Sequence, residues 1–168
     1  MLKKTKYMAI GDTSRDLQLG YGKGIISHVN EYTYFGVRRT KDRNHEPEIN
    51  DRINTGRAAL TKLNSILWDR DVTPKTKAHI YQAIVKSTIT YAAETWCLKA
   101  KSVAKLNSTE TDFWRRSARI SRKDKIRYTV LRQKMNVARS LLDDIKTKQL
   151  QWYGHVQRME EGRLPKKL

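Results

Sequence analysis

The spacing of apolar residues along the chain changes near residue 45. Before that point they occur in short runs separated by glycines and polar residues, which predicts strands joined by turns. The runs are Lys6–Ile10, Leu17–Leu19, Ile25–Val29 and Tyr32–Val37. The middle two flank the glycine-rich turn Gly20–Gly24, and the last predicts a single strand with alternating aromatic residues.

From residue 46 onward, apolar residues recur every three or four positions, as in amphipathic helices. Glu46-Pro47-Glu48 places a proline and two acids at a first helical turn. The apolar face that follows is Ile49, Ile53, Gly56, Leu60, Leu63 and Leu67. A second helix begins at Thr73-Pro74, with the threonine as N-cap. Its expected buried face is Tyr81, Ile84, Val85, Thr88, Ile89, Ala92 and Trp96. A short link over 69–72 predicts that the two helices are antiparallel.

Three more helices are predicted downstream. One starts near Ser102, a short one covers about 124–135, and the last runs from about Ala138 to Met159. Their apolar stripes are Val103, Leu106, Glu110, Phe113 and Ser117 in the first, and Leu141, Leu142, Ile145, Gln149, Trp152 and Val156 in the last. The sequence therefore predicts an α+β, mostly α fold. We expect a β part over 1–44, a helical domain over 45–122 and a basic helical extension over 123–168.

Charge narrows the classes of partner. The 168 residues carry 35 Lys and Arg against 17 Asp and Glu, a net charge of +18. Leu, Ile, Val and Phe make up roughly 21% of the chain, which predicts a thin core. A run of 18 apolar residues, which a membrane helix needs, does not occur. The single cysteine, Cys97, excludes an intramolecular disulfide, and we expect it to be a small packing residue.

The positive charge is concentrated toward the C-terminus. Residues 101–168 carry 18 basic and 7 acidic side chains, and the densest window is 115–134. This predicts a polyanionic partner, with nucleic acid ahead of an anionic membrane surface. Spacing puts Arg115, Arg119 and Arg122 on one helical face that could follow a phosphate backbone. The aromatic residues interleaved with the basic ones could stack on bases: Trp114, Tyr128, Trp152 and Tyr153. Core packing is the alternative for each aromatic residue. We favour it for Trp152 and leave it open for Tyr153.

No convincing catalytic constellation appears. The four histidines, His28, His45, His79 and His155, are scattered without metal-ligand spacing. The pair Asp143-Asp144 suggests two-metal phosphoryl transfer, but it lies in a helical pattern. We interpret the pair as acids in a first turn, where the helix dipole stabilises them.

Several motifs carry a family resemblance. Lys4-Thr5-Lys6-Tyr7-Met8 resembles the Lys-Thr-Lys-x-Met strand near the end of the palm of non-LTR (LINE-type) retrotransposon reverse transcriptases. Tyr32–Gly36 is similar to their Phe-x-Tyr-Leu-Gly primer-grip motif. Further segments follow in the family's order through the helical thumb and just beyond it: Glu48–Ile53, Ala59–Trp68, Lys75–Tyr81, Tyr91–Trp96 and Leu150–Lys166.

The resemblance implies roles for particular residues. Tyr34, Phe35 and Gly36 would hold the primer end, and Lys4 would match the palm lysine that assists pyrophosphate departure. A thumb over about 46–120 would grip the backbone of an RNA–DNA hybrid or DNA duplex. The expected backbone contacts are Lys75, Lys77, Arg115, Arg116, Arg119 and Arg122. The missing palm and fingers would be supplied in trans. An element that copies itself into a genome implies an intracellular protein with access to the nucleus.

Two other interpretations remain open. The helices over 124–135 and 138–159, joined by Asn136-Val137, could form a stand-alone helix-turn-helix module with a preferred DNA sequence. Alternatively, the chain is a decayed fragment without a function.

The sequence also departs from the family. Phe35 and Tyr32 replace the usual Leu and Phe, and the metal-binding aspartates that lie upstream in the family are absent. Without those carboxylates, nothing here would place two Mg²⁺ ions, which we expect only in the complete polymerase. We therefore predict that the chain alone is not an enzyme and contains no cofactor. A primer-extension assay checks this, and Mg²⁺-dependent extension by the pure protein would contradict it.

Overall fold

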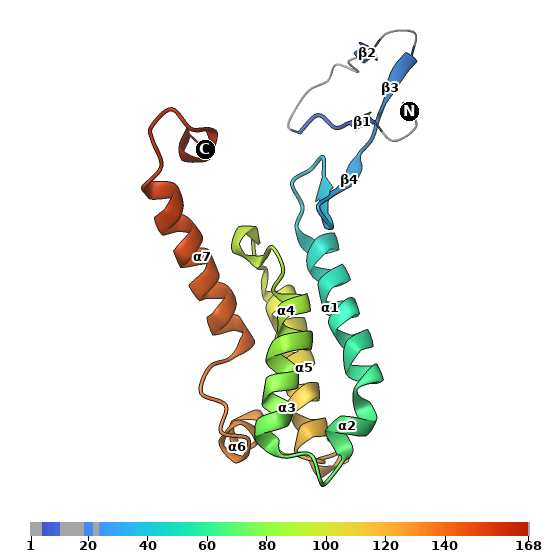
Figure 1. Ribbon diagram of the computed structural model, residues 1–168, viewed down its shortest axis with the longest axis vertical. Helices are drawn as coiled ribbons and strands as arrows, with labels where there is room; N and C mark the ends of the chain where they lie inside the picture. The colour runs from blue at the N-terminus through green and yellow to red at the C-terminus, as the bar shows by residue number, and fades with distance from the viewer. Residues whose placement is uncertain (1–4, 11–18, 22–23, 168) are drawn as a thin grey trace. The chain divides into compact units, whose positions relative to one another are not determined.

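The chain divides into two compact units, 1–48 and 49–168 (Figure 1). The computed structural model describes residues 5–10, 19–21 and 24–167. Short strands precede a mostly helical part, so the predicted α+β, mostly α class is confirmed. The division falls four residues after the boundary expected from the change of periodicity.

The first unit contains two small sheets. In the first, β3 (Gly24–His28) pairs in parallel with β1 (Lys6–Tyr7) and antiparallel with β2 (Leu19–Tyr21). The second is a hairpin of β4 (Glu31–Tyr34) and β5 (Val37–Thr40). The single strand predicted over Tyr32–Val37 is therefore wrong, because the chain reverses at Phe35-Gly36. Both turn residues have positive φ, 47° and 72°, as a type I′ turn requires.

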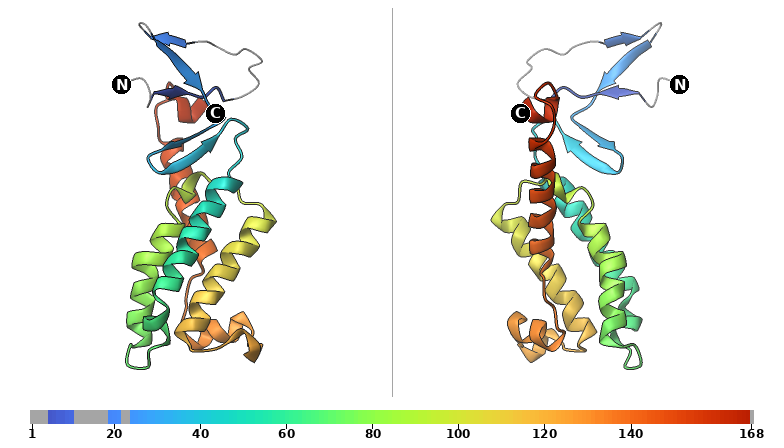
Figure 2. Two further views of the ribbon diagram at one scale, coloured as in Figure 1. Left: turned by 90° about the vertical axis from the view of Figure 1, so that its right-hand side faces the viewer. Right: turned by 60° about the vertical axis from the view of Figure 1, so that its left-hand side comes forward.

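The second unit is a bundle of antiparallel helices (Figure 2). Its elements are α1 (Glu46–Lys62), α2 (Asn64–Trp68), α3 (Pro74–Ile80), η2 (Tyr81–Lys86), α4 (Ser87–Ile89), η3 (Ala93–Thr95), α5 (Ala100–Ser117), η4 (Arg122–Asp124), α6 (Tyr128–Lys134), α7 (Leu141–Gln157) and α8 (Leu164–Lys167). Elements α3, η2 and α4 follow one another without a break over residues 74–89, and we call them the α3–α4 rod. Helices α1 and α5 run in one direction, and the rod and α7 run in the other.

The α3–α4 rod starts as predicted, because the Thr73 hydroxyl accepts the Thr76 N–H at 3.2 Å and Pro74 follows it. Its middle is a π-helical turn, η2, which widens the helix by a residue. Val85 and Ile89 are buried, whereas Ile84, predicted to share their face, is 43% exposed. The π turn shifts the register that a regular helical repeat assumes.

One hydrophobic core runs through the second unit. It takes residues from α1, the rod and α5, and also Leu131, Leu141 and Ile145 from α6 and α7. Helices α6 and α7 therefore share a core with α1, the rod and α5 in one compact unit, and do not form an extension that begins at residue 123.

Helices α1 and α4 approach closely at Gly56. A Cβ atom at this position would lie 2.5 Å from Cγ1 and 2.7 Å from Cδ1 of Ile89, a side chain with no exposed surface. Only glycine fits this contact without moving a core side chain.

A buried carboxylate joins α7 to the rest of the bundle. Glu110 of α5 is 1% exposed. Its Oε1 accepts the Leu141 N–H at 3.0 Å and the Tyr81 hydroxyl at 3.4 Å, and its Oε2 accepts the Tyr128 hydroxyl at 2.9 Å. Three separate elements thus supply the donors that a buried carboxylate needs. The pKa of each tyrosine lies above its ordinary value, because burial and the Glu110 charge disfavour the phenolate.

The first prediction concerns Gly56. We expect Gly56→Ala to lower the free energy of unfolding by about 1–3 kcal/mol through overpacking, against its helix-propensity gain of about 1 kcal/mol. Gly154→Ala in α7 is the matched control, because its Cβ would meet only the flexible end of Arg158 at 3.4 Å. That control should be neutral or slightly stabilising. Urea denaturation of both variants measures the difference, and equal effects would refute the close-packing role.

The second prediction concerns alkaline pH. Tyr81 and Tyr128 keep their protons in the folded state, whereas the unfolded chain loses them near pH 10. Their contribution to stability is therefore complete below about pH 10 and declines as the pH rises above it. In a tyrosinate absorbance titration we expect Tyr81 and Tyr128 to stay unionised near pH 11 while circular dichroism remains native. The Tyr128→Phe variant should have one fewer tyrosine that stays unionised at this pH. Ionisation of all the tyrosines with the fold intact would contradict the prediction.

Candidate nucleic-acid interface

The arginines expected on one helical face do not share one. Helix α5 ends at Ser117, and its last carbonyls are capped by Arg119 N–H to Arg116 O at 3.0 Å and Ile120 N–H to Arg115 O at 2.9 Å. Arg119 has φ 58°, the left-handed conformation of the residue that follows such a helix end. Arg122 lies beyond it, in the separate turn η4. The i, i+4, i+7 spacing is therefore broken by the helix end.

Two of the predicted arginines hold the fold together. The guanidinium of Arg115 donates to the carbonyls of Ser121 at 3.3 Å and Ile126 at 2.5 Å, which closes the loop after α5. Arg116 donates to Asn64 of α2 at 2.7 Å and pairs with Asp112 at 3.0 Å. Both side chains are half-buried, so their main contacts are internal.

The two predicted lysines of α3 have opposite positions. Lys75 is exposed, whereas Lys77 is 3% exposed. The Lys77 ammonium donates to the carbonyls of Asp69 at 2.7 Å and Ser117 at 3.4 Å, and so links the α2–α3 loop to the end of α5. Burial, followed by the nearby Arg119 charge, lowers the pKa of Lys77. The expected contact of Lys77 with nucleic acid is therefore wrong.

Exposed cations instead gather at the end of α5 and on the neighbouring segment that contains the α2–α3 loop and the start of α3. Lys77 links this loop to the end of α5. We call this group of side chains the basic end: Arg70, Lys75, Arg119, Arg122, Lys123, Lys125 and Arg127. Arg122 is 78% exposed and pairs with Asp112 at 3.2 Å, a contact worth little at the surface. The dense charge window of the sequence included most of these residues, but which cations are exposed depends on where α5 stops.

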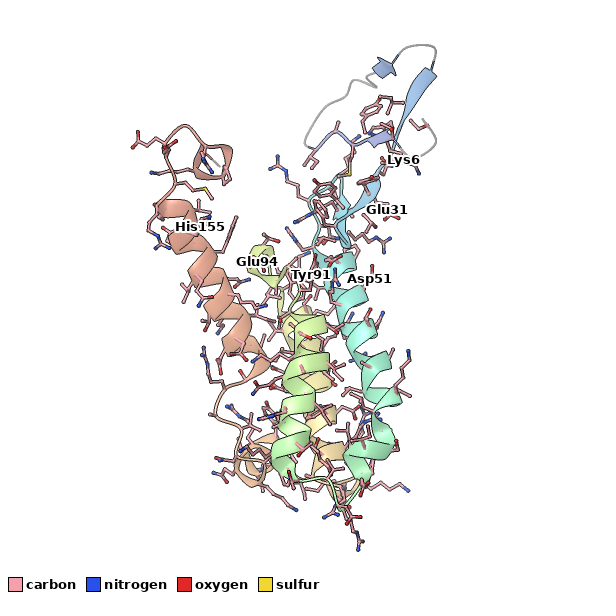
Figure 3. The ribbon with its side chains drawn as sticks, in the orientation of Figure 1. Lys6, Glu31, Asp51, Tyr91, Glu94 and His155 are labelled. Carbon is pink, nitrogen blue, oxygen red and sulfur yellow. The ribbon has the colours of Figure 1, made fainter. Side chains whose placement is uncertain are left out.

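The opposite end of the helical unit carries acidic side chains among its basic ones. Asp51 lies in the first turns of α1, and Glu94 lies in η3 beside Tyr91 (Figure 3). The Arg52 guanidinium lies over the Tyr91 ring, 4.6 Å from its centroid. Seven exposed cations gather at the basic end, with the exposed acids Asp69, Asp71 and Asp124 among them.

The primer-grip-like residues form the tip of the β4–β5 hairpin in the first unit. Tyr34 is 61% exposed and Phe35 is 76% exposed, with ring centroids 4.4 Å apart in an edge-to-face arrangement. A phenylalanine with φ 47° is strained, and such strain is concentrated at functional sites. Gly36 completes the turn. Lys4 lies outside the described residues.

The helix-turn-helix interpretation does not fit the geometry. The connection between α6 and α7 spans six residues, 135–140, where that motif has three or four. The first residues of the would-be recognition helix are the buried Leu141 and the acids Asp143 and Asp144. Acids at this helix start would repel a phosphate backbone.

The interleaved aromatic residues divide between core and surface. Trp114 is 4% exposed and packs against Phe113 and Tyr81, and Tyr128 is bound to Glu110. Trp152, predicted to be in the core, is 39% exposed, and Tyr153 is 62% exposed. Cys97, expected to be a packing residue, is also exposed.

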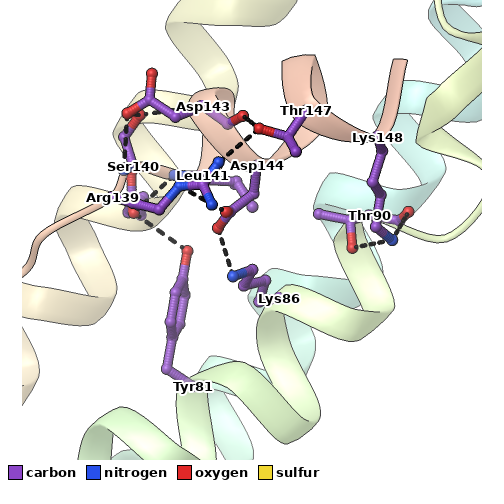
Figure 4. Close-up of polar contacts among 11 residues, drawn as sticks. Tyr81, Lys86, Thr90, Arg139, Ser140, Leu141, Asp143, Asp144, Thr147 and Lys148 are labelled. Carbon is purple, nitrogen blue, oxygen red and sulfur yellow. Dashed lines mark hydrogen bonds and ion pairs between the residues drawn. The ribbon is translucent and has the colours of Figure 1, made fainter. Parts of the chain in front are cut away.

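A polar cluster joins the rod to the start of α7 (Figure 4). Asp144 pairs with Lys86 of η2 and with Arg139 at 3.6 Å. Asp143 caps the helix start, accepting the Ser140 hydroxyl at 2.7 Å and the Ser140 N–H at 3.0 Å, and these two bonds lower its pKa. Both acids are thus in a first turn, as predicted. In the described part of the chain, no cluster of three or more His, Cys, Asp or Glu side chains could hold a metal ion. Nor does any described helix have the length and apolar character needed to cross a membrane.

Comparison with known proteins gives one informative match. No protein-family model matches the chain, and no solved structure matches it. Over 141 residues, the chain is 26% identical to the uncharacterized transposon-derived protein F52C9.6 of Caenorhabditis elegans. The match covers 82% of this chain and 50% of the relative, so the chain spans about half the length of that curated protein. The chain is therefore similar to a transposon-derived protein.

Proposed function

We propose that the helical unit binds the sugar-phosphate backbone of duplex nucleic acid through the basic end. The observation that carries this proposal is the clustering of exposed Arg and Lys side chains around the end of α5. Phosphates are the partners for which such clusters are suited, since long cationic side chains neutralise them without reading bases. Four acids lie among these cations. Asp112 pairs with Arg122 and Arg116, Asp124 accepts the Ser121 N–H, Asp69 accepts the Asp71 N–H, and Asp71 is exposed. The seven cations of the basic end outnumber them.

The biological setting that we propose is a retrotransposon reverse transcriptase. The order of motifs resembling the palm end and thumb of non-LTR enzymes supports it, as does the similarity to a transposon-derived protein. In this assignment the chain contacts the template–primer duplex, and the palm and fingers of the complete polymerase hold the catalytic carboxylates and Mg²⁺. The chain alone would bind nucleic acid without extending it.

The hairpin tip supplies the second contact in this proposal. Tyr34 and Phe35 are exposed aromatic side chains on a tight turn, a shape suited to packing against a base or sugar. They would touch the primer strand, while the basic end contacts phosphates.

Charge reversal within the basic end tests the proposal. Lys123→Glu with Lys125→Glu replaces two exposed lysines next to the end of α5. We expect duplex affinity to fall for every sequence, and the slope of log affinity against log salt to flatten by about 2, since each phosphate contributes about 0.9. Fluorescence anisotropy with labelled RNA–DNA hybrid, DNA duplex and a scrambled duplex measures both effects.

The matched control is Lys99→Glu with Lys101→Glu. These exposed lysines have the same spacing and lie at the start of α5, far from the basic end. Both double variants change the net charge equally, so a general charge effect would weaken binding in both. Equal losses would refute the basic end as the contact surface. Tight binding to one sequence that survives high salt would refute backbone recognition.

A further inference from the structure

A cavity between the rod and the α6–α7 connection has no role in the proposed backbone contact. Its volume is about 380 Å³, within the range typical of small-molecule sites. One wall is the π turn η2, which contributes Tyr81, Gln82 and Lys86, and the facing wall is the connection over 135–139. Isolated π turns are frequent at functional sites, because they place side chains where a regular helix cannot.

The indole ring of Trp114 lines the cavity. Its nitrogen is buried and has no hydrogen-bond partner among the described residues, and the side chain is 4% exposed. A ligand in the cavity would pack against this ring and change the surroundings of its N–H.

The polar groups of the walls define the chemistry of the ligand. Gln82 and Asn136 present amides, each of which both donates and accepts, and such groups suit the edge of a nucleobase. Lys86 and Arg139 share the single carboxylate of Asp144, which leaves a formal charge of +1. One surplus positive charge matches one phosphodiester.

We propose that this cavity binds a single nucleotide, with its base among Trp114, Gln82 and Asn136 and its phosphate near Lys86 and Arg139. The inference deepens the proposed nucleic-acid binding and rests on it for the source of the nucleotide, a strand held at the basic end. The neutral Tyr81 hydroxyl, held by Glu110, keeps the deep wall uncharged. An acidic peptide would use the cations but would leave the amides and the indole without matching groups.

The indole N–H signals of the ¹⁵N-labelled full chain report binding directly. The chain has four tryptophans, and Trp68→Phe, Trp152→Phe and Trp96→Phe assign three signals, leaving Trp114 by elimination. Trp96 is the internal control, because its indole nitrogen is also buried without a partner in the described part of the chain, but its ring does not line the cavity. We expect deoxyadenosine monophosphate or a deoxyadenylate hexamer to shift the Trp114 signal and leave the Trp96 signal in place. A shift with the monophosphate identifies a free nucleotide as sufficient, and a shift with the hexamer alone identifies a nucleotide within a strand.

Substitutions in the walls test the assignment of the amides. Asn136 has φ 51°, a conformation that glycine adopts freely, and Gln82 is exposed on its helix, so Gln82→Ala with Asn136→Gly should fold normally. We expect nucleotide affinity to fall at least about tenfold, or about 1.4 kcal/mol. Gln133→Ala is the control, since that amide lies across the connection and lines a different hollow.

Three results would overturn the proposal. They are no movement of the Trp114 signal with either nucleotide probe, an equal shift with inorganic phosphate, and a shift with polyglutamate alone. The Lys123→Glu, Lys125→Glu variant separates this proposal from the preceding one. This variant should lose duplex affinity and keep the shift of the Trp114 signal that the monophosphate causes. If only the hexamer causes a shift, the variant should show that shift at a saturating hexamer concentration. If the unsubstituted chain fails to bind duplex while the nucleotide still shifts its Trp114 signal, only the basic-end proposal is contradicted.

Discussion

The helical unit depends on the buried carboxylate of Glu110. The side chain lies on the apolar stripe of α5, where a charged group is unfavourable unless donors surround it. The donors come from η2, from α6 and from the first residue of α7, so the carboxylate is satisfied only when all three elements have docked. Helix α7 is joined to residues much earlier in the chain by this contact and by Lys148 and Gln149, which donate to backbone carbonyls of Thr90 and Trp96. Hydrophobic burial supplies the driving force, and Glu110 selects one arrangement of the helices.

The same packing decides which cations face solvent. Arg115, Arg116 and Lys77 look equivalent to their neighbours in the sequence, yet each donates to a carbonyl or amide oxygen of another segment. Helix ends expose such oxygens, and the end of α5 lies where three segments meet. Of the cations in the basic end, Arg70, Arg119, Lys125 and Arg127 lie on loops and Arg122 and Lys123 lie in the short turn η4, so this surface follows a helix end and not a helix face.

Local sequence signals predicted most helices well, whereas features set by tertiary packing could not be predicted from the sequence. Thr73-Pro74 predicted the start of the rod, because capping chemistry is local. The strand expected over Tyr32–Val37 failed because the aromatic alternation hides a turn, and only the glycine at 36 marks it. Ile84 was misplaced because a π turn has no sequence signature. Trp152 continues the apolar stripe of Leu141 and Ile145, but it lies a full two turns beyond Ile145 and is left partly exposed.

Candidate site residues were harder to predict than elements, for a related reason. A helical wheel assumes that the helix continues, so the grouping of Arg115 with Arg119 and Arg122 required a helix through residue 122. The chain instead turns left-handed at Arg119, a conformation that glycine usually supplies at helix ends. Arginine at this position directs a cation away from the helix axis at the cost of about 1–2 kcal/mol of backbone strain. The side chain of Arg119 is exposed, so its charge is available to a polyanion such as a phosphate backbone.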